Sequence, residues 1–195
     1  MECDNTLPDN SDLRDKILRY FDKLNFSLPH KDGQEAVSDA LNSTVLEGGK
    51  RLRPYLTYLF CELCKIKDKH GKYTLSECIE FVHAASLSHD DVIDRASTRR
   101  GKESINVVIG NKKSVLAGDY LLSEVIQRLC RLNNLDILHE MSAVIKDLSI
   151  GEWLQHGLLT DRNYTYDSLI KVSSLKTSSV LTWCIVSPLI YSKAS

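Results

Sequence analysis

The sequence predicts an all-α fold, an antiparallel helical bundle whose helices are joined by short connections. Almost every segment repeats its apolar residues at helical spacing, and no stretch alternates convincingly in the way of a β-strand. With 195 residues, 43% of them hydrophobic and 26% charged, the chain has the composition of an ordinary globular protein. The sequence contains no internal repeat and no long linker, so residues 1–195 are interpreted as a single domain.

The first predicted helices follow a short N-terminal segment. Residues 1–10 are expected to be flexible, and Ser11 can cap a first helix. A second helix is expected over about residues 34–47, and Gly48-Gly49 interrupt the chain after it. A third helix carries Pro54 in its first turn, where a missing N–H group costs least. The apolar positions are Leu13, Ile17, Leu18, Phe21 and Leu24 in the first helix, and Leu56, Leu59, Phe60 and Leu63 in the third.

The remaining helices are predicted from turn and capping signals. The segment His70-Gly71-Lys72 is interpreted as a turn. Thr74 and Glu77 have capping-box spacing, which predicts that a fourth helix starts there and runs to about Asp94. A polar, basic stretch follows over residues 95–104. Three more helical segments are predicted over about residues 113–132, 136–156 and 166–191.

The charge balance and the cysteines exclude several classes of function. The chain has 25 Lys and Arg against 26 Asp and Glu, a formal net charge of -1. Bulk charge therefore favours no nucleic acid partner, and any anion site must be a local cluster. Six cysteines are too few for a disulfide-built scaffold. Cys61 and Cys64 form a lone C-x-x-C pair without a second ligand pair, so buried thiols are favoured over a metal or redox site.

No membrane span and no targeting segment are expected. The longest apolar stretch, about residues 180–191, falls short of the roughly 20 residues that cross a bilayer. The N-terminal sequence MECDNTLPDNSD is acidic and lacks both an apolar core region and an Arg-rich amphipathic pattern. These features predict a cytoplasmic protein.

A first cluster of chemically active residues is GGKRLRP, residues 48–54. Its glycines allow a tight turn and a close approach of backbone to a ligand. Lys50, Arg51 and Arg53 then stand at the start of a helix, where the helix dipole disfavours positive charge. An anion would compensate that cost, so the cluster indicates a phosphate or diphosphate site, with a solvated basic loop as the alternative.

A second cluster is HAASLSHDDVID, residues 83–94. On a helix, Asp90 and Asp94 share a face, and Asp91 is turned by about 100°. Carboxylates this close repel one another unless a cation intervenes, and their oxygens suit Mg²⁺. His83, two turns earlier, lies on nearly the same face. The alternative, a plain acidic helix end, is disfavoured by the helix dipole.

A third cluster is Thr98-Arg99-Arg100-Gly101-Lys102, directly after the aspartates. Arginine suits bidentate contacts with phosphate. Farther along the chain, Lys176-Thr177 and the polar pair Glu152 and Gln155 lie within otherwise apolar helices. Each of these later signals is explained about equally well by a solvated stripe.

The order of GGKRLRP, His83, DDVID, TRRGK, VLAGDYLL (residues 115–122) and Lys176-Thr177 resembles that of the trans-polyprenyl diphosphate synthases, long-chain type, from about residue 47 to residue 177. The resemblance implies a bundle around a deep central cavity, usually in a homodimer, that joins isopentenyl diphosphate to an allylic prenyl diphosphate with Mg²⁺ as cofactor. It implies substrate-binding roles for Lys50, Arg53, His83, Arg99, Arg100, Lys176 and Thr177. It implies catalytic roles for Asp90, Asp91, Asp94, Arg99 and Lys176, with the three aspartates as the metal ligands.

The length of the product is suggested by two small residues. Ala85 and Ser86 lie about one turn before Asp90, where the growing chain would pass down the cavity. In the family, large aromatic residues at these places go with short products. The small side chains therefore favour a long prenyl product, as used for quinone side chains.

One part of the family pattern has no counterpart. A second aspartate-rich motif is expected after Lys176-Thr177, and the sequence through residue 195 contains none. The chain is therefore interpreted as lacking the C-terminal part of the fold, with Trp183, Ile185 and Leu189 left to expose apolar surface. Two functions remain open: a prenyltransferase, or a non-catalytic subunit or partner module of a polyprenyl synthase.

Overall fold

The fold is seen in a computed structural model that describes residues 19, 24 and 26–194. The predicted flexible segment 1–10 and the first helix, apart from Arg19 and Leu24, lie outside the described residues. The elements in chain order are α2 (Glu35–Ser43), α3 (Leu52–Leu63), α4 (Lys69–Ile93), β1 (Thr98–Arg99), β2 (Lys102–Glu103), α5 (Ile105–Ile109), α6 (Asn111–Cys130), α7 (Leu135–Asp161), α8 (Tyr166–Ser173), the π-helix η1 (Ser174–Ser178) and α9 (Ser179–Ala194). The all-α prediction is confirmed.

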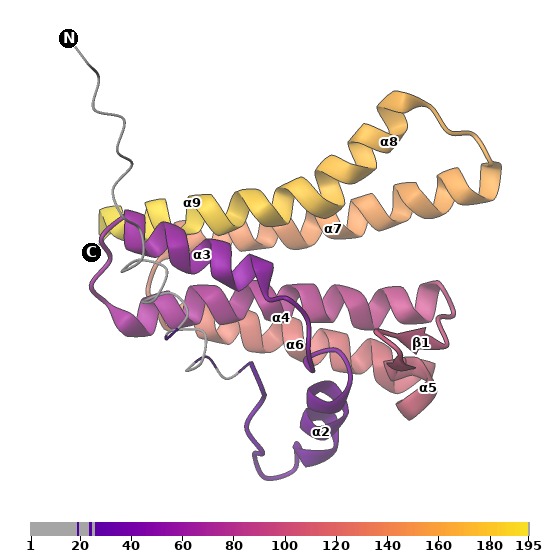
Figure 1. The fold of residues 1–195 in the computed structure, drawn as a ribbon, viewed down its shortest axis with the longest axis horizontal. Helices are drawn as coiled ribbons and strands as arrows, with labels where there is room; N and C mark the ends of the chain where they lie inside the picture. The colour runs from indigo at the N-terminus through magenta and orange to yellow at the C-terminus, as the bar shows by residue number, and fades with distance from the viewer. Residues whose placement is uncertain (1–18, 20–23, 25, 195) are drawn as a thin grey trace, which may run out of the picture.

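The long helices pack in layers (Figure 1). Helices α4 and α6 lie side by side in one layer, and α3, α7 and α9 form the layer that faces them. The hairpin of α7 and α8 extends beyond the end of α3. The antiparallel neighbours and short connections match the sequence-based expectation.

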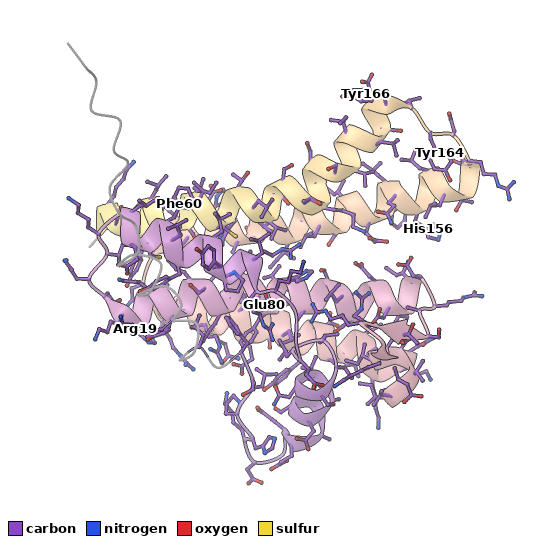
Figure 2. The ribbon with its side chains drawn as sticks, in the orientation of Figure 1. Arg19, Phe60, Glu80, His156, Tyr164 and Tyr166 are labelled. Atoms are coloured by element: carbon purple, nitrogen blue, oxygen red, sulfur yellow. The ribbon has the colours of Figure 1, made fainter. Side chains whose placement is uncertain are left out.

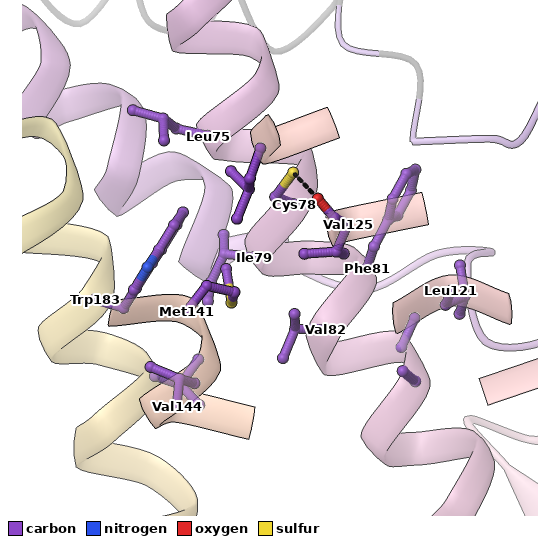
Figure 3. Close-up of a cluster of buried hydrophobic side chains, with 14 of the residues drawn as sticks. Leu75, Cys78, Ile79, Phe81, Val82, Leu121, Val125, Met141, Val144 and Trp183 are labelled. Atoms are coloured by element: carbon purple, nitrogen blue, oxygen red, sulfur yellow. Dashed lines mark hydrogen bonds between the residues drawn. The ribbon is translucent and has the colours of Figure 1, made fainter. Parts of the chain in front are cut away.

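The core fills the space between the layers (Figure 3). Side chains from α4, α6, α7 and α9 meet there, and the Sγ atom of Cys78 lies 3.9 Å from the carbonyl oxygen of Val125. Trp183 is only 2% exposed, so the prediction that it would lack a packing partner is wrong. Leu189 is 44% exposed, as expected. The labelled core residues are Leu75, Cys78, Ile79, Phe81, Val82, Leu121, Val125, Met141, Val144 and Trp183.

Helix α4 begins earlier than the sequence predicts. Asp68 caps it, its carboxylate accepting hydrogen bonds from the backbone N–H groups of His70 and Gly71 at 2.9 Å. The predicted turn at residues 70–72 is therefore the first turn of a helix, and Thr74 is buried within it. Gly71 is needed there because a β-carbon would lie 2.3 Å from the Cε1 atom of Tyr191.

Helix α3 buries a different face from the one predicted. Thr57 and Cys61 are fully buried, whereas Leu63 is 59% exposed. Leu56, Leu59 and Phe60 are only half-buried. The reason is that α3 contacts both α4 and α9, which cover the side of the helix carrying the small polar residues.

The sequence did not predict the β-hairpin or the continuous helical stretch at the C-terminal end of the described residues. The basic stretch forms an antiparallel hairpin of β1 and β2, with Arg99 opposite Lys102. Helices α8 and α9 are continuous through η1. The resulting stretch Tyr166–Lys193, 28 residues, is long and apolar enough to cross a membrane by length and composition, although the apolar run counted from the sequence was shorter. In the fold it packs along α3 and α7.

Candidate active site

The turn that connects α2 to α3 is held against the β-hairpin. Gly48 and Gly49 have φ angles of 68° and 86°, which favour glycine. A β-carbon at Gly49 would lie 2.9 Å from the Nη1 atom of Arg100, so the glycine lets this guanidinium lie against the backbone. Arg100 Nη1 donates to the carbonyl oxygen of Glu47 at 2.8 Å, and Lys102 Nζ donates to Glu47 Oε1 at 2.6 Å. Residues that are far apart in sequence thus form one wall.

This wall encloses a small cavity of about 190 Å³. The glycine turn lines one side of the cavity, and the hairpin with the end of α4 lines the other. Arg99 and Arg100 both contribute to the lining. The cavity therefore places guanidinium groups beside the glycine backbone, which is suited to an anion.

His83 lies among the same cations. Burial, followed by the positive charges of Arg53, Arg100, Arg99 and Arg51, lowers the pKa of His83 from its usual 6.5 to about 3. The imidazole is therefore neutral at physiological pH. The Nε atom of Arg53 is buried and has no hydrogen-bond partner among the described residues. An unpaired guanidinium nitrogen beside several other cations is the electrostatic signature of an anion site.

The cations of the GGKRLRP cluster have different environments. Arg51 adopts the left-handed conformation at the start of α3, with φ of 49°, and its guanidinium pairs with Glu80 and with the Leu46 carbonyl oxygen. It also lies over the Phe26 ring, 4.7 Å from the centroid. Glu80 marks this position between α3 and α4 in Figure 2. Arg51 is thus engaged in the fold, whereas Lys50 is exposed on the glycine turn.

The aspartates at the end of α4 separate into different environments. Asp90 lines a large cavity, and Asp94 is exposed at the helix end. Burial, with the nearby carboxylates of Glu152 and Asp94, raises the pKa of Asp90 to about 6, and Lys176 acts in the opposite direction. Asp91 is fully buried and pairs with Arg99.

The aspartates fit a divalent cation only in part. Asp90 and Asp94 are four residues apart on the helix and repel each other electrostatically. A bound Mg²⁺ ion would relieve this repulsion, with water and phosphate oxygens completing its coordination. Among the described residues, no group of three His, Cys, Asp or Glu side chains could hold a metal ion. Asp91, the third predicted ligand, is buried beside Arg99 and does not line the large cavity with Asp90.

The π-helix η1 carries Lys176 toward α7. Its Nζ atom pairs with Glu152 and donates to Gln155 Oε1 at 3.1 Å. A β-carbon at Gly151 would lie 2.7 Å from Lys176 Cγ, so this glycine allows the close approach. Single π-turns inside α-helices are frequent at functional sites. Thr177, the next residue, is exposed.

The large cavity has a volume of about 950 Å³ and lies between α4, α6 and α7. Ala85, Ser86 and Asp90 line it from α4, so the structure brings both small residues to the same wall as the carboxylate. His156, which lines it from α7, lies on the side of that helix that faces α4 and α6 (Figure 2). Tyr164 and Tyr166 lie at the far tip of the α7–α8 hairpin.

Sequence reasoning missed a polar pair in this cavity. His89 and Asp119 both line it, with His89 Nε2 3.4 Å from Asp119 Oδ1 and 3.2 Å from the Val115 carbonyl oxygen. A β-carbon at Gly118 would lie 2.2 Å from His89 Nε2. In the sequence, the pair could have been suspected from Gly118 and Asp119, which interrupt an otherwise apolar helical segment.

Comparison with known proteins finds a match to the family model described as Polyprenyl synthetase over residues 34–195. Solanesyl-diphosphate synthase 2, chloroplastic, of Oryza sativa subsp. japonica is 37% identical over 182 residues, which are 89% of this chain and 45% of that protein. The human all trans-polyprenyl-diphosphate synthase is 37% identical over 139 residues, which are 68% of this chain and 34% of that protein. The chain thus spans less than half the length of these curated relatives.

Solved structures give the same picture of the fold. A decaprenyl diphosphate synthase from Rhodobacter capsulatus superposes with a TM-score of 0.80 at 25% identity, covering 95% of this chain and 56% of that one. A polyprenyl synthase from Caulobacter crescentus superposes with a TM-score of 0.83 at 24% identity, covering 94% of this chain and 56% of that one. The helical layers described above are those of these proteins.

Proposed function

The chain belongs to the polyprenyl synthetase family, and on that premise we propose that it acts in prenyl transfer. The reaction is the Mg²⁺-dependent, head-to-tail condensation of isopentenyl diphosphate with an allylic prenyl diphosphate, with a long-chain product. One observation carries the proposal: Arg99, which lines the small cavity beside the glycine turn, pairs with Asp91, and the preceding residue in the chain, Asp90, lines the large cavity. An anion-binding cluster and a carboxylate-lined cavity therefore adjoin at this arginine.

The cationic cluster suits the diphosphate of isopentenyl diphosphate. Arg53 and Arg100 supply charged donors, and Lys50 adds a cation from the glycine turn. The low pKa of His83 keeps its imidazole neutral, so it can donate one N–H without adding to the charge repulsion. Burial strengthens each of these interactions because little water competes for them.

The mouth of the large cavity suits the allylic diphosphate. Asp90 and Asp94 would hold Mg²⁺, which supplies Lewis-acid stabilisation of the departing diphosphate when bound. Lys176 is held by Glu152 and Gln155 close to Asp90, and Thr177 and Arg99 add further donors. Lys176 is therefore held in place before the substrate arrives, which is the condition for electrostatic stabilisation of a leaving group.

The body of the large cavity suits the hydrocarbon chain. Its walls are largely apolar, and Ala85 and Ser86 leave it open next to Asp90. Reaction then depends on positioning, because the allylic carbon must lie against the isopentenyl double bond. The names of the relatives, solanesyl and decaprenyl diphosphate synthases, support a long product.

Self-association as a homodimer is part of the proposal. Helix α6 exposes large apolar side chains, among them Leu116 at 65% and Ile126 at 46%. Such residues on one helix favour burial against a second copy. Size-exclusion chromatography with light scattering of the purified chain would detect the dimer, and a monomer at micromolar concentration would contradict this part.

The test of the proposed function uses the purified chain, Mg²⁺, farnesyl diphosphate and radiolabelled isopentenyl diphosphate. We expect a labelled polyprenyl product that disappears when EDTA removes the metal and in the variant Asp90→Asn. Binding of both diphosphates without product assigns the chain to the second class, a non-catalytic partner module. Failure to bind either diphosphate contradicts the proposal.

A further inference from the structure

We propose that His89 is a positioning residue that sets the separation of α4 and α6 where the hydrocarbon part of the large cavity begins. Its imidazole packs against Gly118 of α6, and this contact determines how closely the cavity wall fits a prenyl chain. The inference rests on the proposed function in taking the large cavity as the site of that chain.

The contact between the two helices depends on one large side chain and one missing side chain. His89 Nε2 lies 3.2 Å from the Val115 carbonyl oxygen and 3.4 Å from Asp119 Oδ1. A carbonyl oxygen can only accept, so Nε2 carries the hydrogen and donates it. A β-carbon at Gly118 would lie 2.2 Å from His89 Nε2 and 2.6 Å from Cδ2. Any other residue at Gly118 would therefore displace the imidazole or push the helices apart.

Small residues flank this contact in both helices. The buried ones nearest to it in sequence are Ala84, Ala85 and Ser88 in α4, and Ser114, Ala117 and Gly118 in α6. Small side chains let two helices approach closely. An imidazole inserted among them is bulky enough to set the separation of the helices at this level.

His89 also belongs to the wall of the large cavity. It lines the cavity together with Ala85 and Ser86 from α4 and with Asp119 and Leu122 from α6. The side chain of a helical residue lies over the turn before it, so the imidazole lies at the level of Ala85 and Ser86. Its side chain is 29% exposed, so part of the ring remains open to the cavity. A change in the α4–α6 separation would thus alter the wall where the chain leaves the diphosphate site.

The groups proposed to hold diphosphate do not share this contact. Arg99 and Arg100 line the small cavity, and Lys176 is held by Glu152 on α7. Inorganic pyrophosphate has no hydrocarbon chain and would not sense the wall between α4 and α6. Comparing it with farnesyl diphosphate therefore separates the role of His89 from the diphosphate site.

The experiment measures the affinity of the purified full chain for farnesyl diphosphate and for inorganic pyrophosphate by calorimetry, in the presence of Mg²⁺. We expect His89→Ala and Gly118→Ala each to weaken farnesyl diphosphate binding by about tenfold, and pyrophosphate binding by less than about twofold. His89→Gln keeps an N–H donor in place of Nε2, so its farnesyl diphosphate affinity should stay within about threefold of wild type. The control is His139→Ala, since the side chain of His139 is 79% exposed.

The double variant His89→Ala/Gly118→Ala tests whether the two residues act through one contact. Its new methyl group enters space that the imidazole has left, so it should bind farnesyl diphosphate more tightly than Gly118→Ala alone. In urea unfolding, Gly118→Ala should lower the midpoint in the wild type and raise it in the His89→Ala background, because alanine favours a helix over glycine once the clash is gone. If Gly118→Ala fails to fold, recovery of the helical circular dichroism in the double variant supports the contact in the same way.

The outcomes distinguish the inference from the proposed function. An unchanged ratio of the two affinities in His89→Ala, or the same sign of the Gly118→Ala effect in both backgrounds, would overturn the role of His89 and leave the proposed function intact. Equal losses for farnesyl diphosphate and pyrophosphate would place the effect of His89 at the diphosphate end and would also overturn it. A wild-type chain that binds neither ligand would contradict the proposed function, and the inference with it.

Discussion

The guanidinium of Arg100 lies directly against the α-carbon of Gly49, from a position 51 residues farther along the chain, and a β-carbon there would come within 2.9 Å of its Nη1 atom. Arg100 also donates to the carbonyl oxygen of Glu47. The glycine turn and the β-hairpin are therefore parts of one binding wall. Its shape depends on the absence of a side chain at one residue.

The variant Gly49→Ala should displace Arg100 and weaken pyrophosphate binding by about tenfold, the loss expected for one charge-assisted hydrogen bond. The matched control is Gly48→Ala, because Gly48 also has a positive φ but its β-carbon would meet nothing within 4 Å. Both variants should lose about 1–2 kcal/mol of stability from backbone strain. Equal affinities for pyrophosphate in the two variants, measured by calorimetry, would contradict the role given to the contact.

The approach of η1 to α7 gives a second matched pair. Gly151→Ala should destabilise the protein by about 1–3 kcal/mol, because the new methyl group would lie 2.7 Å from Lys176 Cγ and 3.0 Å from Leu175 Cβ. Gly157→Ala, on the same helix, meets nothing within 4 Å and should stabilise it by about 0.5–1 kcal/mol. Urea unfolding measures both changes, and a stabilised Gly151→Ala would show that the helices are not packed as described.

The buried imidazole of His83 predicts a dependence of stability on pH. Its folded-state pKa is about 3, below the ordinary 6.5, so between these values the unfolded chain binds more protons. The free energy of unfolding should therefore fall as the pH decreases from 6.5 toward 3, with a slope of up to about 1.4 kcal/mol per pH unit from this group. In His83→Gln this contribution should vanish.

The control for that measurement is His139→Gln, since the side chain of His139 is 79% exposed. Its pH profile of unfolding by urea should match that of the wild type. If the His83→Gln profile also matched the wild type, the imidazole would not be held neutral by burial and the surrounding arginines.

The cavity wall beside Asp90 predicts a change in chain-length preference. Ser86→Phe places an aromatic ring in the large cavity, which should shorten the product if the chain turns over. Independently of turnover, it should weaken the binding of geranylgeranyl diphosphate relative to farnesyl diphosphate, because the longer chain needs the space that the ring fills. Ser142→Phe, at an exposed position on α7 outside the cavity, is the control. An unchanged affinity ratio and an unchanged product would refute the role of Ser86.

The sequence by itself determined the helical class and the end of α4, and it predicted the chemical character of the site. These depend on local information: apolar periodicity, the glycine pair and the four-residue spacing of Asp90 and Asp94. A helix puts residues of that spacing on one face whatever surrounds it. The glycine pair and the basic cluster likewise indicated an anion site without reference to any partner.

Tertiary structure decided where helix α4 starts, which face of α3 is buried and which side chain Asp91 contacts. Helix α4 starts at Lys69 and not near Thr74, because Asp68 is fixed both by its cap and by Tyr191, whose Oη donates to it at 2.5 Å. The buried face of α3 depends on α4 and α9, which no local pattern in α3 encodes. Asp91 turns away from Asp90 in any helix, but only the folded hairpin gives it Arg99 as a partner. Spacing fixes the direction of a side chain, whereas the element packed there determines the group that it meets.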